Sequence, residues 1–488
     1  MKQVILRQII TRNSACAASN RWRFQRGILT LLLSLMAFNA YSLSTSAIAT
    51  MGYIYGFPIV LMDETKLGLT GEQRSCTLGT DINTLANVFD IPDSNFEAVV
   101  RPNVDTLYTS AMLDLSSGVQ LLDMPAVSDR YVLMALLDAW SNNFAGMGTQ
   151  THGESAGQYA IAGPDWSGNV DDIPQGYELI EAPTNLVWLV GRTELKGPDD
   201  VAAVNAIQKQ YRLYSANNPS KVNPISSPEC VPDEDREPPI DVVKSLSGEE
   251  FFSRLSALMI SNPPPEEDSW MVNTLGTIGV GPMAKGDVSN LSKLQKKQLD
   301  IGIATAQVSL DTSLDLLSFG GWGPNPALVP LGDYGTHYFI RAVVAQVGFG
   351  ANEGKFAVYQ NASRDDRLER LNGENNYTLT FNKNELPPVK AFWSLTVYAD
   401  DGFLTDNRAA RMLGITRFAL GSNDELIQDD EGNITLYLAS IPPLGAPLSN
   451  WLPTPKGNFQ VTIRLYDPES AILENEWQVP SLIKEDRF

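Results

Sequence analysis

The chain has 488 residues and a formal net charge of −21, with 57 acidic against 36 basic side chains. Such a charge balance excludes proteins that bind nucleic acid or anionic lipid through basic patches. The sequence contains only 2 histidines, which excludes zinc and iron sites built from several imidazoles, and we expect neither a metal nor a cofactor.

The first 49 residues are expected to form a secretory signal peptide. Basic residues without any acid precede an apolar run over residues 28–38, which is far shorter than the ~20 residues of a membrane span. Ala47-Ile48-Ala49 offers the small residues that signal peptidase requires. We therefore expect a mature chain that begins near Thr50, is periplasmic or secreted and does not insert into a membrane. An uncleaved signal anchor is the alternative.

Residues 50–195 are expected to form an N-terminal β-rich domain with a leading helix. Apolar residues have helical spacing over residues 51–62. Between residues 105 and 193 they alternate as in strands, with Gly- and Pro-containing turns between the runs.

Residues 196–347 are expected to form a helical middle region. Residues 201–214 and 291–317 have helical patterns. Ser247-Gly248-Glu249-Glu250 is a capping box ahead of another amphipathic helix.

Residues 348–488 are expected to form a C-terminal β-sandwich domain, with strands over residues 377–381, 392–398, 434–438 and 459–466. The two β regions also share an ordered set of features. Each has a strand that opens with Tyr-Thr, then a strand that ends near an acid (Asp138 or Asp400), then a Pro-Thr pair before a strand that carries Arg192 or Arg464. The expected fold class is therefore α+β and multidomain, with two β-sandwich-like domains flanking a helical middle section, and the shared order favours a duplication.

A short motif raises the question of a hydrolase. Residues 153–157 read Gly-Glu-Ser-Ala-Gly, the G-x-S-x-G pattern of a nucleophile elbow. An elbow requires an apolar strand that enters the serine and a helix that leaves it. The residues before Ser155 are polar and Gly-rich, and those after it alternate like a strand. Asp333 and His337 complete a triad only in chain order, so Ser155 is expected to be a turn residue.

Cys76 and Cys230 follow the expected leader. Two cysteines in an oxidising compartment often pair, but sequence alone does not place them within bonding distance. A disulfide and two isolated buried thiols both remain open.

Several motifs resemble a known pair of domains. Residues 100–108 (Val-Arg-Pro-Asn-Val-Asp-Thr-Leu-Tyr), with Arg130-Tyr131, Asp138 and Ala162-Gly163-Pro164, resemble the domain of unknown function 1254. Residues 392–398, with Asn450-Trp451-Leu452-Pro453 and Arg464-Leu465-Tyr466, resemble the domain of unknown function 1214. The resemblance covers most of residues 52–482 and implies an exported bacterial protein with β-sandwich domains and a helical section. It implies no established reaction, and the two cysteines are not part of the family pattern.

The candidate site residues fall in two segments. Residues 101–108 place several functional groups at a loop-to-strand junction, where binding groups often gather, and the end of a neighbouring strand is expected to join them. A second polar face is expected around residue 337 on one side of a helix. The candidates for ligand binding are Arg101, Asn103, Asp105, Tyr108, Asp138, Asn142, Tyr334 and Arg341. The alternative is a buried polar network that satisfies its own hydrogen bonds.

Two functions from different classes follow. One is the binding of a small polar molecule or glycan in a pocket between the β domains. The other is a cofactor-independent hydrolase or lyase with Asp105 and Tyr108 as the candidates for catalysis. The chain has no Rossmann glycine fingerprint, P-loop or H-E-x-x-H motif, and its sequence does not decide between these functions or indicate an oligomeric state.

Overall fold

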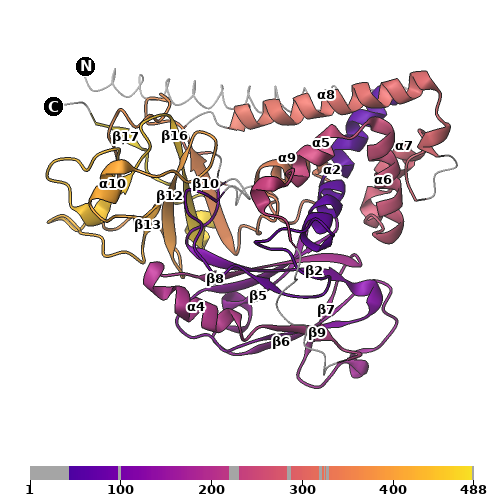
Figure 1. Ribbon diagram of the computed structural model, residues 1–488, viewed down its shortest axis with the longest axis horizontal. Helices are drawn as coiled ribbons and strands as arrows, with labels where there is room; N and C mark the ends of the chain where they lie inside the picture. Colours follow the sequence, from indigo (N-terminus) through magenta and orange to yellow (C-terminus); the bar gives the residue numbers. More distant parts are fainter. Residues whose placement is uncertain are drawn as a thin grey trace, which may run out of the picture.

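The computed structural model describes residues 43–96, 101–218, 230–282, 287–317, 321–323, 325 and 329–485. Residues 1–42 of the expected signal peptide lie outside this part of the chain. An N-terminal β domain lies below a helical region and a C-terminal β domain in the view of Figure 1, so it contacts both.

The N-terminal β domain consists of two packed sheets. The first has five antiparallel strands in the order β1 (Ala86–Asn87), β2 (Thr106–Asp114), β8 (Leu186–Glu194), β4 (Val132–Asp138) and β5 (Asn143–Gly148). The second has the order β7 (Glu178–Glu181), β6 (Gly157–Ala162), β3 (Gln120–Met124) and β9 (Arg212–Ser215). Alternate residues of both sheets, such as Leu113, Leu136 and Ile161, form the core between them.

The C-terminal β domain also consists of two sheets. The first has the order β10 (Ala357–Ala362), β16 (Phe459–Tyr466), β12 (Trp393–Ala399) and β13 (Ala419–Gly421). The second has the order β15 (Trp451–Pro453), β14 (Ile434–Ala439), β11 (Tyr377–Phe381) and β17 (Ile483–Lys484). Their inward residues, such as Leu379, Leu395 and Ile463, form a separate core. Two short helices, α10 (Arg408–Met412) and α11 (Ser470–Leu473), lie in the connections.

The two β domains have the same topology. Taken in chain order, the strands from β2 to β9 and those from β10 to β17 occupy equivalent places in their sheets. Thus β2-β8-β4-β5 corresponds to β10-β16-β12-β13, and β7-β6-β3-β9 to β15-β14-β11-β17. A parallel pair recurs as well, between β6 and β7 and between β14 and β15. The expected fold class is confirmed, and the one-to-one strand order is that of a duplicated β-sandwich.

The N-terminal β domain extends beyond the expected boundary at residue 195. Residues 201–214 were expected to form one helix, but α4 (Val201–Gln208) ends early and β9 follows it. Leu213 of β9 lies opposite Leu122 of β3 and is buried in the same core. Pairing with β3 therefore outweighs the helical spacing of these residues.

The helical region is organised around α2 (Thr45–Thr70). Five helices pack against it: α5 (Pro239–Ser245), α6 (Gly248–Ser261), α7 (Ser269–Gly276), α8 (Lys293–Leu317) and α9 (Tyr338–Gly348). The expected capping box at the start of α6 is present, with Ser247 and Glu250 bonding each other's backbone. The remaining described helix, α3 (Thr149–His152), follows β5.

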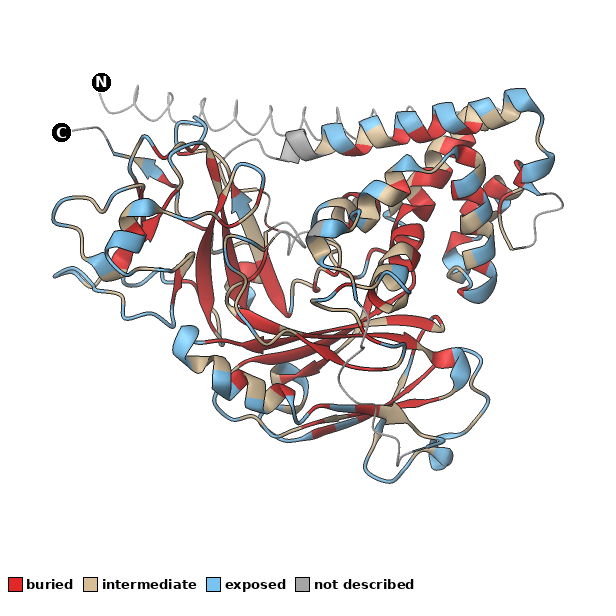
Figure 2. Ribbon diagram, in the orientation of Figure 1, coloured by how far each residue is buried: buried red, intermediate tan, exposed pale blue. Residues whose placement is uncertain are grey.

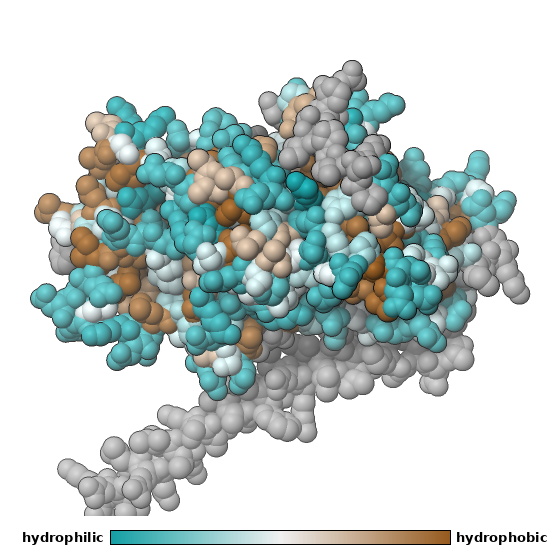
Figure 3. All heavy atoms as spheres, turned by 90° about the horizontal axis from the view of Figure 1, so that it is seen from below, coloured by the Kyte–Doolittle hydropathy of each residue, from teal (hydrophilic) through white to brown (hydrophobic). Residues whose placement is uncertain are grey.

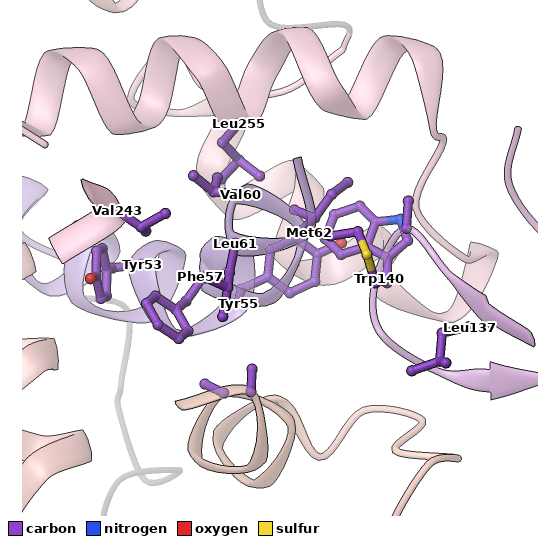
Figure 4. Packing of buried hydrophobic residues seen from close by; sticks show 14 of the residues in the cluster. Tyr53, Tyr55, Phe57, Val60, Leu61, Met62, Leu137, Trp140, Val243 and Leu255 are labelled. Atoms are coloured by element: carbon purple, nitrogen blue, oxygen red, sulfur yellow. The ribbon is translucent and has the colours of Figure 1, made fainter. Parts of the chain in front are cut away.

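Helix α2 is buried on nearly all sides, as the red ribbon in Figure 2 shows. Its Ser44 N-cap accepts a hydrogen bond from the Ala47 amide at 3.2 Å. Gly52 and Gly56 allow α6 and α7 to approach, because an added Cβ at either position would lie 2.5 Å from a leucine side chain. Figure 4 shows the α2 side chains packed beside Val243, Leu255 and Trp140.

In length and composition, α2 is the one helix in the described part of the chain that could cross a membrane, but 67% of its apolar window is buried inside the protein. It is the central helix of the helical region rather than a leading helix of the N-terminal β domain. It also begins at Thr45, so Ala49, the residue at which cleavage was expected, is fully buried in its second turn. Cleavage there would remove five residues of this helix.

Cys76 and Cys230 form a disulfide with a Cα–Cα distance of 4.9 Å. The bond joins the segment between α2 and β1 to the segment before α5, so both cysteines lie in connections of the N-terminal β domain with the helical region. Of the two outcomes left open by the sequence, the disulfide is the one observed. The face of the molecule in Figure 3 is mostly hydrophilic, with hydrophobic residues in separate groups.

Candidate functional site

The candidate residues of the 101–108 segment lie where the two β domains meet. Arg101 has a left-handed backbone conformation, with φ of 51°, and its amide donates to the Gly402 carbonyl at 2.8 Å. Its guanidinium donates to Oε1 of Gln460 on β16, with the shorter distance 2.7 Å. The loop before β2 is thus fastened to the C-terminal β domain by both backbone and side chain.

Asn103 fixes the shape of this loop. Its Oδ1 accepts the Asp105 amide at 2.9 Å, which makes an Asx turn, and its Nδ2 donates to the Tyr466 hydroxyl at 2.7 Å. One side chain therefore sets the local turn and bridges to β16 in the other domain.

Asp105 contacts the C-terminal domain at two points. Ser394 of β12 donates to its Oδ2 at 2.5 Å, and Nη1 of Arg464 lies 3.8 Å from the same oxygen. Burial raises the pKa of the Asp105 carboxyl, and the opposing effects of Arg464 and Ser394 do not cancel this. The carboxyl group is consequently easier to protonate than one in water.

Arg464 is 3% exposed, and neutral groups satisfy most of its donors. Its Nη1 donates to Thr396 Oγ1 at 2.7 Å, and its Nη2 donates to the Tyr398 hydroxyl at 2.6 Å. The Tyr398 hydroxyl donates in turn to the Pro102 carbonyl at 2.8 Å. The guanidinium is therefore held in place by β12 and by the loop of the other domain.

A matching arginine comes from the N-terminal domain. Arg192 of β8 lies opposite Tyr108 of β2, and Arg464 of β16 lies opposite Tyr359 of β10. The guanidinium carbons are 5.3 and 5.5 Å from the centres of the respective tyrosine rings. We call Tyr108, Arg192, Tyr359 and Arg464 the Arg–Tyr cluster.

Sequence reasoning found this cluster only in part. Tyr108 was a candidate, and Arg192 and Arg464 were noted as matching features of the two β regions, but not as site residues. Nothing in the sequence singled out Tyr359, and Ser394 was noted only within residues 392–398, which resemble the 1214 domain. Tyr359 could be identified only from the pairing of β10 with β16, which places it directly opposite Arg464.

A cleft of about 720 Å³ lies beside this interface. Asp105 and Ser394 both line it, so their hydrogen bond forms part of its wall. The rest of the lining mixes apolar side chains with polar ones from both domains, including Lys196, Trp393, Asn423 and Asp424. Burial raises the pKa of Asp424 as well. Two carboxyl groups with a raised pKa therefore face one cleft.

Asp138 and Asn142 do not join the 101–108 segment as expected. Asp138 lies five residues along β4 from Leu133, the residue opposite Arg192, which corresponds to roughly 17 Å of strand. Its carboxylate accepts the Trp140 and Asn142 amides at 2.9 and 2.8 Å and the Asn142 side chain at 2.9 Å. Burial raises the pKa of Asp138 to about 6, with hydrogen bonds from Asn142 opposing.

Arg341 lies near Asp138 rather than on an open polar face. Its guanidinium carbon is 5.4 Å from the ring centres of Tyr55, Trp140 and Tyr338, and the side chain is 1% exposed. Helix α9 starts at Tyr338, so Tyr334 lies in the segment before it and the expected helical face that was to carry both residues does not form. Tyr334 is buried, which raises its pKa, and the charge of Arg341 acts against this effect. Arg341, Asp138 and the surrounding aromatic rings thus form a structural network that joins the helical region to the first sheet of the N-terminal domain.

Ser155 is an exposed residue in the turn before β6. The strand that follows begins at Gly157, so no helix leaves the serine, and the elbow geometry that an oxyanion hole requires is not formed. The expectation of a turn residue is confirmed. Within the described residues, no group of three or more His, Cys, Asp or Glu side chains could hold a metal ion.

Comparisons with known proteins agree with the resemblance noted in the sequence. Residues 82–215 match the model of a protein of unknown function, DUF1254, and residues 356–470 match that of a second one, DUF1214. No curated protein matches the chain.

Two solved structures are similar. The VPA0106 protein from Vibrio parahaemolyticus is 20% identical, with 91% of this chain and 100% of that chain covered and a TM-score of 0.67. A putative uncharacterized protein from Burkholderia cenocepacia is 10% identical, with 89% and 88% covered and a TM-score of 0.44. At 20% identity, the first likeness shows a shared fold and nothing about function.

Proposed function

The chain belongs to the family of proteins that pair a DUF1254 domain with a DUF1214 domain, and we propose that it binds a small polar molecule or glycan in the cleft between them. The observation that carries this proposal is the Asp105–Ser394 pair in the cleft wall, which combines a carboxyl from one domain with a hydroxyl from the other. A ligand held there contacts both domains at once.

The size and lining of the cleft support a neutral polar ligand. About 720 Å³ is within the usual range of small-molecule sites and has room for a mono- or disaccharide. Asn423 offers an amide and Ser394 a hydroxyl, which are groups that recognise sugar hydroxyls.

The test is a thermal-shift screen of the purified protein against neutral mono- and disaccharides and polyols, repeated with Ser394→Ala. We expect at least one probe to raise the melting temperature of the wild type, and Ser394→Ala to weaken its binding about tenfold while the unliganded protein melts nearly unchanged. Tyr177→Phe, at the residue just before β7 of the N-terminal domain, is the matched control. If no probe shifts the wild type, or if Ser394→Ala binds as well as the control, the proposal is wrong.

A cofactor-independent hydrolase or lyase is the second candidate, and one observation favours it. Asp105 and Asp424 line the same cleft, both have a raised pKa, and the charge of Asp424 contributes to raising the pKa of Asp105. Paired carboxyl groups of this kind serve as general acid and base. Tyr108, the other candidate for catalysis, does not line this cleft within the described residues. Incubation with a metabolite mixture distinguishes the two functions, since an enzyme yields product that Asp105→Asn and Asp424→Asn each abolish.

We also propose that the protein is exported to the periplasm or the exterior, where the Cys76–Cys230 disulfide would be stable. Cleavage after Ala49 would remove the Ser44 cap and the buried Ile48 from α2, whereas cleavage before Ser44 would retain them. N-terminal sequencing of the exported protein distinguishes the two. Recovery of the intact Met1 form from the exported fraction would contradict cleavage altogether.

A further inference from the structure

The duplication brings two equivalent arginine–tyrosine pairs together at the domain interface. Arg192 and Arg464 lie on the central strands β8 and β16, and Tyr108 and Tyr359 lie opposite them on the equivalent strands β2 and β10. The pairs meet at the Tyr466 hydroxyl, which accepts hydrogen bonds from Asn103 in the loop before β2 at 2.7 Å and from Tyr359 at 3.4 Å. Four equivalent side chains from two domains thus form one cluster.

The cluster contains more positive charge than its immediate partners neutralise. Within the described residues, no carboxylate lies within 4.0 Å of Arg192. Its two terminal nitrogens donate to neutral oxygens, Oδ1 of Asn352 at 2.9 Å and the Gly350 carbonyl at 3.1 Å, and its buried Nε has no partner. Arg192 is 5% exposed, and a buried guanidinium normally has an anionic partner.

Arg464 is only weakly paired. Its nearest carboxylate oxygen, on Asp105, is 3.8 Å away and already accepts a short hydrogen bond from Ser394. Its buried Nε also has no hydrogen-bond partner in the described part of the chain. The cluster therefore attracts a further negative charge.

The two tyrosines of the cluster provide hydrogen-bond donors and are more exposed than the arginines. Tyr108 and Tyr359 are half-buried, while the arginines behind them are almost fully buried. The Arg192 guanidinium carbon lies 5.3 Å from the centre of the Tyr108 ring, and the Tyr359 hydroxyl donates to the Tyr466 hydroxyl only at 3.4 Å, a long bond that an anion can replace. Burial raises the pKa of Tyr108, but the charges of Arg192 and Arg464 together with hydrogen bonding lower it below its ordinary value, and such a phenol is a strong donor.

We propose that the Arg–Tyr cluster is an anion site that binds a small organic carboxylate, with the phenols of Tyr108 and Tyr359 as direct donors and Arg192 and Arg464 as the compensating charge. This site goes beyond the proposed function, because neither tyrosine lines the cleft of the described residues. A carboxylate supplies one delocalised negative charge with two acceptor oxygens, which matches two phenol donors in front of two guanidiniums.

The experiment is calorimetric titration of the full exported chain with succinate and acetate, with glycerol as the neutral probe. We expect succinate to bind the wild type, and Tyr108→Phe and Tyr359→Phe each to raise its Kd about tenfold or more. Asp105→Asn should lower the Kd several-fold, because it removes a competing carboxylate beside Arg464. Tyr177→Phe is again the control and should bind like the wild type.

A spectroscopic readout separates binding from a merely structural role. Tyrosinate absorbs near 295 nm, and a bound anion should shift the titration of Tyr108 to higher pH, a shift that Tyr108→Phe abolishes. The proposal is overturned if folded wild-type protein binds neither carboxylate, if both phenylalanine variants bind succinate like the control, or if only inorganic sulfate binds. A failed saccharide screen would not affect this result, since the probe and the phenylalanine variants lie outside the cleft.

Discussion

The two β domains have the same strand order, but equivalent faces of their central sheets carry different side chains. In the N-terminal domain this face presents Met112, Val190 and Leu137, which are buried against the helices. In the C-terminal domain it presents Ser394, Thr396 and other polar residues. The arginine of the central strand occurs in both.

This difference follows from what covers each face. Helix α2 and its neighbours cover most of the N-terminal face, so apolar side chains are favoured there (Figure 2). The equivalent C-terminal face meets the loop of residues 101–105, whose backbone carbonyls and polar side chains need partners. Equivalent faces of the two domains thus differ: the N-terminal face is part of an apolar core, and the C-terminal face forms a polar interface.

The largest difference between the two domains is expected when the two equivalent arginines are replaced. Arg464→Leu leaves Asp105 buried without a nearby cation, so we expect it to reduce the free energy of unfolding by about 3–5 kcal/mol. Arg192→Leu leaves only the neutral oxygens of Asn352 and Gly350 without a donor, so we expect a smaller loss in the free energy of unfolding, about 1–3 kcal/mol. Urea denaturation of both variants at neutral pH measures the difference. Equal losses would show that the two arginines have the same role.

The disulfide belongs to the N-terminal half of the chain, and the C-terminal β domain contains no cysteine. The bond closes a loop with a sequence separation of 154, for which the chain-entropy model gives at most ~5 kcal/mol. We expect the double variant Cys76→Ser, Cys230→Ser to lose about 2–5 kcal/mol in urea denaturation. Reduced wild-type protein is the control and should match it. A double variant as stable as the oxidised protein would contradict the prediction.

The strand-end acids make a further contrast. Asp138 is 3% exposed with a pKa of about 6, whereas Asp400 beside β12 is exposed and paired with Arg370 at 2.6 Å. Because the folded-state pKa of Asp138 is above its unfolded value near 4, its contribution is fully present below pH ~4 and is lost as the pH rises through about 6. A shift of about two units corresponds to roughly 3 kcal/mol.

Asp138→Asn should therefore remove much of the decline in stability between pH 4 and 6. The variant can keep its hydrogen bonds, since the Asn142 amide can turn and present its unpartnered Oδ1 to the new side chain. Thermal unfolding as a function of pH measures this, with Asp400→Asn as the exposed control, which should change stability by less than ~0.5 kcal/mol. A variant with the same pH profile as the wild type would mean that Asp138 titrates normally.

The smallest effect is expected at Ser155, in a turn of the N-terminal domain. Ser155→Ala removes an exposed hydroxyl, so we expect less than ~0.5 kcal/mol of change in the free energy of unfolding. A fluorophosphonate probe should not label the wild-type protein. Stable labelling at Ser155 would contradict the turn assignment.

The sequence by itself determined the architecture: strands at 377–381 and 459–466, the capping box at Ser247, and a shared order of features that ended in Arg192 and Arg464. These depend on local periodicity and on short-range hydrogen bonds, which act between neighbouring residues. The same local rules failed at β9, where a tertiary strand pairing overrode helical spacing. They also failed before α9, which begins four residues after Tyr334.

Only the tertiary structure decided which candidates share a site. Asp105 and Asp138 were both expected in one site, yet the first meets Ser394 and Arg464 from more than 280 residues away and the second closes a local turn beside Arg341. Tyr359 acquires its place from strand register, which pairs it with Arg464. Contacts between distant segments depend on how whole sheets pack, and no local pattern in either segment encodes the identity of its partner.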